Sequence, residues 1–98
     1  MIRHCVMFKW ADGTTDDQKQ AVRDGLDAMR AEIPEIQSYS FGDDAGLGGD
    51  GNHDFVVVGE FADEAAYRTY AEHPVHVALI KELIRPIVAA RSVIQYEV

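Results

Sequence analysis

Cysteine, proline and basic residues are all scarce in this sequence. Its single cysteine, Cys5, excludes an intramolecular disulfide and fits a reducing compartment, so a cytoplasmic protein is expected. Nine lysine and arginine residues stand against 17 acidic residues, which gives a formal net charge of −8. Nucleic acids and anionic membranes both need positive patches on a partner, so neither is expected to bind. No apolar run approaches the roughly 20 residues of a membrane-spanning helix.

What is present is typical of one small globular domain covering residues 1–98. The sequence is 47% hydrophobic and 27% charged. Alternating apolar residues predict strands over residues 2–10, 36–42, 54–61 and 92–98. Between them, a capping box of Thr15 and Gln18 opens a helix that should end near Ile33. Asp63 should cap a second helix, which breaks at Pro74 and resumes to about residue 85.

The order strand–helix–strand–strand–helix–strand is that of a ferredoxin-like α+β fold. Right-handed crossovers then place both helices on one face of a four-stranded antiparallel sheet. The uncovered face is expected to carry apolar side chains, namely Cys5, Met7, Tyr39, Phe41, Val56 and Val58. Such a patch is unusual on a soluble monomer, so we expect two copies to pair through it as a two-fold homodimer.

Two groups able to exchange protons flank the break at Pro74. After the break, His76 shares one helical stripe with Ile80 and Leu83, and before it Tyr70 lies on a similar apolar stripe. Both side chains should therefore point into the same buried layer. The alternative is a core histidine with its hydrogen bonds satisfied and a tyrosine whose hydroxyl lies at the rim.

Several stretches of the chain resemble the stress-responsive A/B-barrel family of small dimeric α+β barrel proteins. They are residues 2–9, Ile33-Pro34, residues 54–58 and the segment Tyr70-x-x-His73-Pro74-x-His76. The resemblance covers essentially the whole chain and implies that the sheet forms a dimeric α/β barrel. Many members of the family have no assigned activity.

One branch of that family, the plant olivetolic acid cyclases, performs an aldol-type ring closure on a linear polyketide. Its catalytic tyrosine and histidine fall on Tyr70 and His76, and its pocket histidine on the first strand falls on His4. Its pocket histidine on the third strand falls on Phe55, so that part of the pattern is absent here.

The residues themselves allow chemistry without a cofactor. Burial lowers the pKa of a histidine and keeps it neutral, so His76 could take a proton from a carbon next to a carbonyl. Tyr70 would then hold the oxyanion, and His4 would orient or relay. The wall of a mostly apolar pocket is expected to comprise Val6, Phe8, Leu26, Met29, Phe55, Val57, Ile80 and Leu83.

Three functions therefore remain open. The first is a homodimer that binds a small apolar or aromatic ligand between sheet and helices. The second is a cofactor-independent cyclase or lyase that uses the Tyr70–His76 pair. The third is a cofactor-free monooxygenase-like or purely structural stress protein. No metal is expected, because the aspartates of loop 43–52 match no calcium loop and His73 and His76 lack a third zinc ligand. His73 is expected to cap the helix instead.

Overall fold

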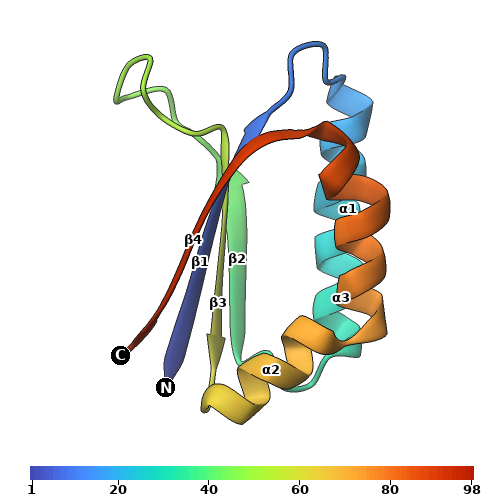
Figure 1. The fold of residues 1–98 in the computed structure, drawn as a ribbon, viewed down its shortest axis with the longest axis vertical. Helices are drawn as coiled ribbons and strands as arrows, with labels where there is room; N and C mark the ends of the chain where they lie inside the picture. The colour runs from blue at the N-terminus through green and yellow to red at the C-terminus, as the bar shows by residue number, and fades with distance from the viewer.

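The computed structural model describes all 98 residues, with one antiparallel sheet covered by helices on a single face (Figure 1). Strands β1 (Ile2–Trp10), β2 (Ser38–Asp43), β3 (Phe55–Phe61) and β4 (Val88–Glu97) lie in the order β2-β3-β1-β4. The helices are α1 (Asp16–Glu32), α2 (Glu64–Glu72) and α3 (Pro74–Leu79). This arrangement confirms the ferredoxin-like α+β fold. None of the helices combines the length and the apolar character that a membrane span requires.

The first two helices begin at the predicted capping residues. The Thr15 side chain accepts a hydrogen bond from the Gln18 backbone N–H at 3.2 Å, and the Gln18 side chain accepts one from the Thr15 backbone N–H at 2.9 Å. Asp63 accepts from the backbone N–H of Ala66 at 2.8 Å. Each side chain satisfies an N–H group that the first helical turn leaves without a partner.

The predicted break also forms. Pro74 occupies the first turn of α3, and the Nδ1 atom of His73 accepts a hydrogen bond from the Val75 N–H at 3.1 Å. The expected continuation of this helix to about residue 85 is wrong, because the regular α-helix ends at Leu79. The chain then passes through a π-helical turn (Ile80–Ile84) and a 3-10 turn (Arg85–Ile87), because Pro86 cannot extend the ladder of backbone hydrogen bonds.

Strand β4 starts at Val88, four residues before the predicted Ser92. The strand follows β1 along its whole length, and a bulge between Lys9 and Trp10 brings Trp10 opposite Val88. Pairing with a long neighbour thus extends a strand into residues whose own pattern is not strand-like. This extension adds Arg91 to the sheet.

The prediction that Tyr39 and Phe41 lie on the uncovered face is wrong. Tyr39 lies directly opposite Gly59 on β3, and directly opposite residues share a face of the sheet. That face is the one beneath the helices, where Tyr39 is buried and Phe41 packs against Phe55. Strand β2 begins at Ser38, and its serines rather than its aromatic residues face away from the helices.

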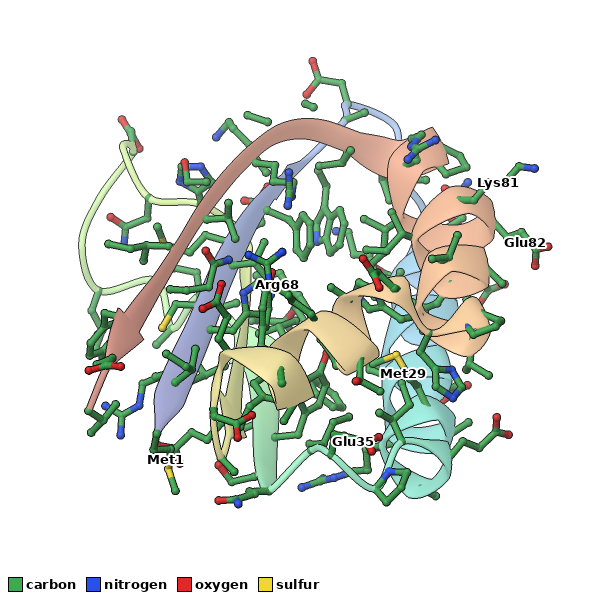
Figure 2. The ribbon with its side chains drawn as sticks, turned by 60° about the horizontal axis from the view of Figure 1, so that its bottom comes forward. Met1, Met29, Glu35, Arg68, Lys81 and Glu82 are labelled. Carbon is green, nitrogen blue, oxygen red and sulfur yellow. The ribbon has the colours of Figure 1, made fainter.

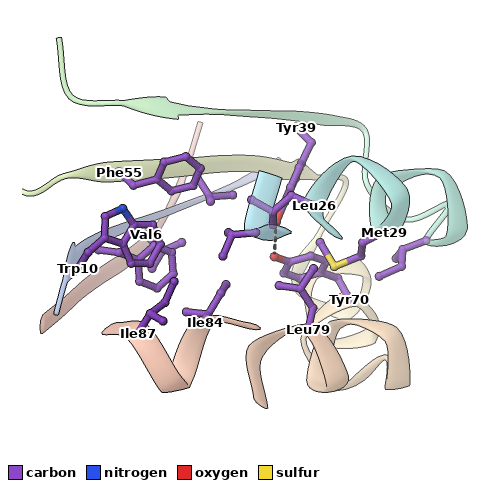
Figure 3. Close-up of a cluster of buried hydrophobic side chains, with 14 of the residues drawn as sticks. Val6, Trp10, Leu26, Met29, Tyr39, Phe55, Tyr70, Leu79, Ile84 and Ile87 are labelled. Atoms are coloured by element: carbon purple, nitrogen blue, oxygen red, sulfur yellow. Dashed lines mark hydrogen bonds between the residues drawn. The ribbon is translucent and has the colours of Figure 1, made fainter. Parts of the chain in front are cut away.

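The core fills the space between the sheet and the helices (Figure 3). At one end Trp10 stacks on Phe8, with ring centroids 5.6 Å apart, and Phe55 packs beside Trp10. At the other end Met29 and Tyr70 are buried between helices and sheet. Trp10 therefore belongs to the core.

The opposite face of the sheet is uncovered and partly apolar (Figure 1). The exposed fractions of Met7 and Ile94 are 42% and 61%. Cys5, Val56 and Val58 on the same face are half-buried by their neighbours. Below, "the open face" means this surface of Cys5, Met7, Val56, Val58 and Ile94.

Candidate functional site

A cavity of about 60 Å³ lies between the sheet and the helices, lined mainly by residues of α2, α3 and the π-helical turn on the helical side. A wider hollow of about 320 Å³ adjoins it, and the two share walls made by Phe8, His76, Ile80, Ile84 and Arg91. Most of the inner lining is apolar. The polar side chains that reach it are His4, Tyr39, Tyr67, Tyr70, His76 and Arg91.

The break at Pro74 fixes the orientation of His76. In a continuous helix the Val75 N–H would bond to the carbonyl of Ala71, but here it bonds to His73. The free Ala71 carbonyl lies 3.0 Å from the Nδ1 atom of His76. A carbonyl oxygen can only accept, so Nδ1 carries the proton and Nε2 keeps a lone pair. Burial lowers the pKa of His76, which favours this neutral form.

His4 has the opposite tautomer to His76. The Nε2 atom of Gln95 on β4 donates to the Nδ1 atom of His4 at 2.9 Å and to the Tyr67 hydroxyl at 3.2 Å. With Nδ1 accepting, the His4 proton is on Nε2. Burial, with smaller effects from the charges of His76 and Arg91, lowers the pKa of His4 to about 4. Between them, the two neutral histidines offer one donor and one acceptor.

Tyr70 bonds to another tyrosine rather than to His76. Its hydroxyl lies 2.9 Å from the hydroxyl of Tyr39, as the dashed line in Figure 3 shows. Burial raises the pKa of Tyr39 to about 12 and that of Tyr70 well above its usual range, so both stay protonated. The rings of Tyr70 and His76 pack against each other, with their centroids 4.3 Å apart.

The sequence-predicted site residues divide into two groups. His4, Tyr70 and His76 come together at the cavity, and five of the expected wall residues also line it: Val6, Phe8, Leu26, Val57 and Ile80. Met29, Phe55 and Leu83 do not line it. Met29 is fully buried in the core and Phe55 packs on Trp10.

The π-helical turn accounts for the displacement of Leu83. A regular α-helix would carry Leu83 on the same stripe as His76 and Ile80. The wider turn adds a residue to the helix, so Ile84 takes that place on the cavity wall. Leu83 packs instead on α1, within 3.0 Å of the position that a Cβ atom on Gly25 would occupy.

Four polar residues of the site were not predicted: Tyr39, Tyr67, Arg91 and Gln95. Tyr67 shares the helical stripe of Tyr70, which could have pointed to it. Gln95 lies opposite His4 and Arg91 opposite Phe8, so both could be found only from the register of β4 on β1. No three histidine, cysteine, aspartate or glutamate side chains are grouped as metal ligands.

Comparison with known proteins identifies the family of this chain. The sequence pattern of the Stress responsive A/B Barrel Domain matches residues 2–98. This chain belongs to that family. An uncharacterised protein of Streptomyces coelicolor is 34% identical over 94 residues, which is 91% of this chain and 96% of the relative.

Solved structures of similar proteins share the ferredoxin-like fold. A dimeric ferredoxin-like protein of unknown function from Thermobifida fusca is 40% identical and superposes with a TM-score of 0.91, over 99% of this chain and 90% of that one. A hydroxynitrile lyase from Passiflora edulis superposes with a TM-score of 0.87 over 99% of this chain and 92% of the lyase. At 19% identity, that second likeness concerns the fold alone.

Proposed function

We propose that this A/B-barrel protein is a homodimer that binds a small apolar or aromatic molecule between sheet and helices. The body of the ligand occupies the hollow of about 320 Å³, and one polar end reaches the inner cavity. A largely apolar hollow with a few convergent polar groups is the usual form of a small-molecule site. The observation that carries the proposal is the meeting of His4 from the sheet with Tyr70 and His76 from the helices around one cavity.

A second function, proton transfer without a cofactor, is favoured by the hydrogen bond from His76 to Ala71. With Nδ1 engaged, Nε2 can take a proton from a carbon next to a carbonyl. The C–H bond breaks, its electron pair moves to the carbonyl oxygen, and the proton ends on Nε2. The hydroxyl pair of Tyr39 and Tyr70 has one proton to donate to that oxygen, and His4 Nε2–H is a further donor.

Binding and proton transfer are tested by one pair of experiments. Shifts of backbone amides on addition of acetophenone, a neutral aromatic ketone with exchangeable α-hydrogens, report binding. Loss of its methyl signal in D₂O reports proton transfer. Shifts confined to the cavity residues are expected, together with exchange faster than in buffer. His76→Ala should abolish the faster exchange, whereas His53→Ala in the loop should not.

The two outcomes separate the functions. Cavity shifts without exchange in the wild-type protein would leave a binding protein and remove the catalytic proposal. The absence of shifts with acetophenone and with a panel of aromatic acids and pyrones would contradict ligand binding itself.

The dimer is proposed to form through the open face. Met7 and Ile94 are exposed there, and apolar surface of this kind is normally covered. The T. fusca protein, 40% identical to this chain, is dimeric, which supports the formation of a homodimer. The single cysteine of the chain, half-buried Cys5, is consistent with the reducing cytoplasm that we propose as its location.

A further inference from the structure

We propose that the ligand is an anion, a small carboxylic acid whose carboxylate is bound by Arg91 with Arg85 at the outer rim. This inference rests on the proposed function, because it names the chemical class of ligand for the same cavity.

Arg85 and Arg91 take part in none of the ion pairs of the molecule. Of the other four arginines, three form ion pairs, Arg3 with Glu60, Arg23 with Asp43 and Arg68 with Glu64, and Arg30 forms none. In a chain with 17 acidic residues, a surface arginine has many possible partners. Two guanidinium groups without a carboxylate partner line the same hollow.

The walls of the hollow and the inner cavity contain no aspartate or glutamate. The contrast with the groove beside the start of α1 is sharp, since that groove is lined by Asp12, Asp16, Asp43, Asp44 and Asp54. A strongly acidic protein thus keeps this largely apolar hollow free of negative charge and places two positive charges there. Such a distribution attracts an anion and disfavours a cation.

Arg91 stands where the hollow meets the inner cavity, because it lines both. On β4 it lies opposite Phe8, so it is on the helix-covered side of the sheet and a dimer through the open face leaves it free. The planar guanidinium can bind both oxygens of a carboxylate. His76 lines both spaces as well, which puts the carbon chain of such an acid beside Nε2.

The influence of Arg91 on the two histidines supports this position. Its positive charge contributes to the lowered pKa of both His4 and His76. A bound carboxylate would therefore be within reach of the same groups that the proposed proton transfer uses.

The test compares acids with their uncharged amides. Dissociation constants of 3-phenylpropionate and 3-phenylpropionamide, and of hexanoate and hexanamide, are measured at constant ionic strength by NMR titration of the full-length protein. In the wild-type protein each acid should bind about tenfold more tightly than its amide. Arg91→Met should remove that preference by weakening the acid far more than the amide, and Arg91→Lys should keep part of it. Arg85→Met should weaken the acid to a smaller extent.

The matched control is Lys81→Met, which removes one positive charge from the π-helical turn that precedes Arg85 and strand β4. Lys81 points away from the sheet in Figure 2 and does not line the hollow, so the Lys81→Met variant should not alter the preference for the acid.

Equal binding of acid and amide by the wild-type protein would overturn the anion inference and leave the binding proposal standing. So would a loss of preference in Lys81→Met equal to that in Arg91→Met. If neither acid nor amide binds, the proposed function fails together with the inference.

Discussion

The hydroxyl groups of Tyr39 and Tyr70 lie 2.9 Å apart and join strand β2 to helix α2 beside the cavity. Gly59 makes this contact possible, because the ring of Tyr39 crosses directly over it. A Cβ atom at position 59 would lie 3.0 Å from that ring. The link couples a residue of the sheet to the tyrosine that was expected to act with His76.

Tyr39→Phe should lower the free energy of unfolding by about 1–2 kcal/mol, because it leaves the buried hydroxyl of Tyr70 without its partner. Tyr70→Phe should cost a similar amount. The double variant should cost clearly less than the sum, since neither hydroxyl is then left unpaired. Urea unfolding of the four proteins measures this. Strictly additive losses would show that the two hydroxyl groups do not interact.

The protein should lose stability as the pH falls from about 6.5 toward 4. An unfolded histidine has a pKa near 6.5, whereas burial lowers that of His4 to about 4 and also lowers that of His76. In this window the unfolded chain binds more protons than the folded one, so acid favours unfolding.

The loss between pH 7 and pH 5 is expected to be about 1–2 kcal/mol, measured by urea unfolding at several pH values. The double variant His4→Gln/His76→Gln should show a much weaker pH dependence over that range. His53→Gln removes a histidine outside the cavity and should behave like the wild-type protein. An unchanged slope in the double variant would contradict the assignment.

Gln95→Leu should change the tautomer of His4 without unfolding the protein. Gln95 is exposed on β4, so its removal costs little packing, but the His4 Nδ1 atom loses its donor. Long-range ¹H–¹⁵N spectra of the histidine rings should show His4 shifting from the Nε2–H form toward a mixture of forms. The comparison is Gln20→Leu on the exposed side of α1, which should leave the His4 signals in place. An unaltered His4 spectrum in Gln95→Leu would mean that another group sets the tautomer.

Val58→Lys should convert the proposed dimer into a monomer. Val58 lies opposite Cys5 in the middle of the open face, where a charge in a sheet-to-sheet interface would be buried without a partner. Light scattering coupled to size exclusion gives the mass in solution. Leu47→Lys is the control, because Leu47 is 91% exposed in the loop before β3 and lies outside the open face. Monomeric wild-type protein, or a dimer that persists in Val58→Lys, would rule out this interface.

The fold could be predicted from local patterns because each pattern has a local cause. Thr15, Asp63 and Pro74 set helix ends through their own side chains or rings, and structure and sequence agree there. Alternation along β1 and β3 correctly separated the covered from the open face. His4, Tyr70 and His76 could be singled out because they combine proton chemistry with an apolar stripe.

The rest depends on contacts between distant parts of the chain. The prediction of which side chains of β2 face the helices is wrong, because the pairing of Tyr39 with Gly59 fixes the face on which Tyr39 lies. Arg91 and Gln95 join the site only through the register of β4 against β1. The π-helical turn places Ile84 on the cavity wall in place of Leu83, and the sequence gives no signal for this turn beyond the nearby Pro86.

Strand β1 lies between β3 and β4, so the first strand of the chain pairs with the last. On the ribosome, residues 2–10 can meet β3 only after residues 55–61 have been made, and can meet β4 only after residues 88–97 have been made. Pairing across such sequence separations folds slowly compared with local structure. The nascent chain therefore carries an unpaired β1 edge until β4 has been made, and Arg91 and Gln95 join the cavity only when β4 pairs with β1.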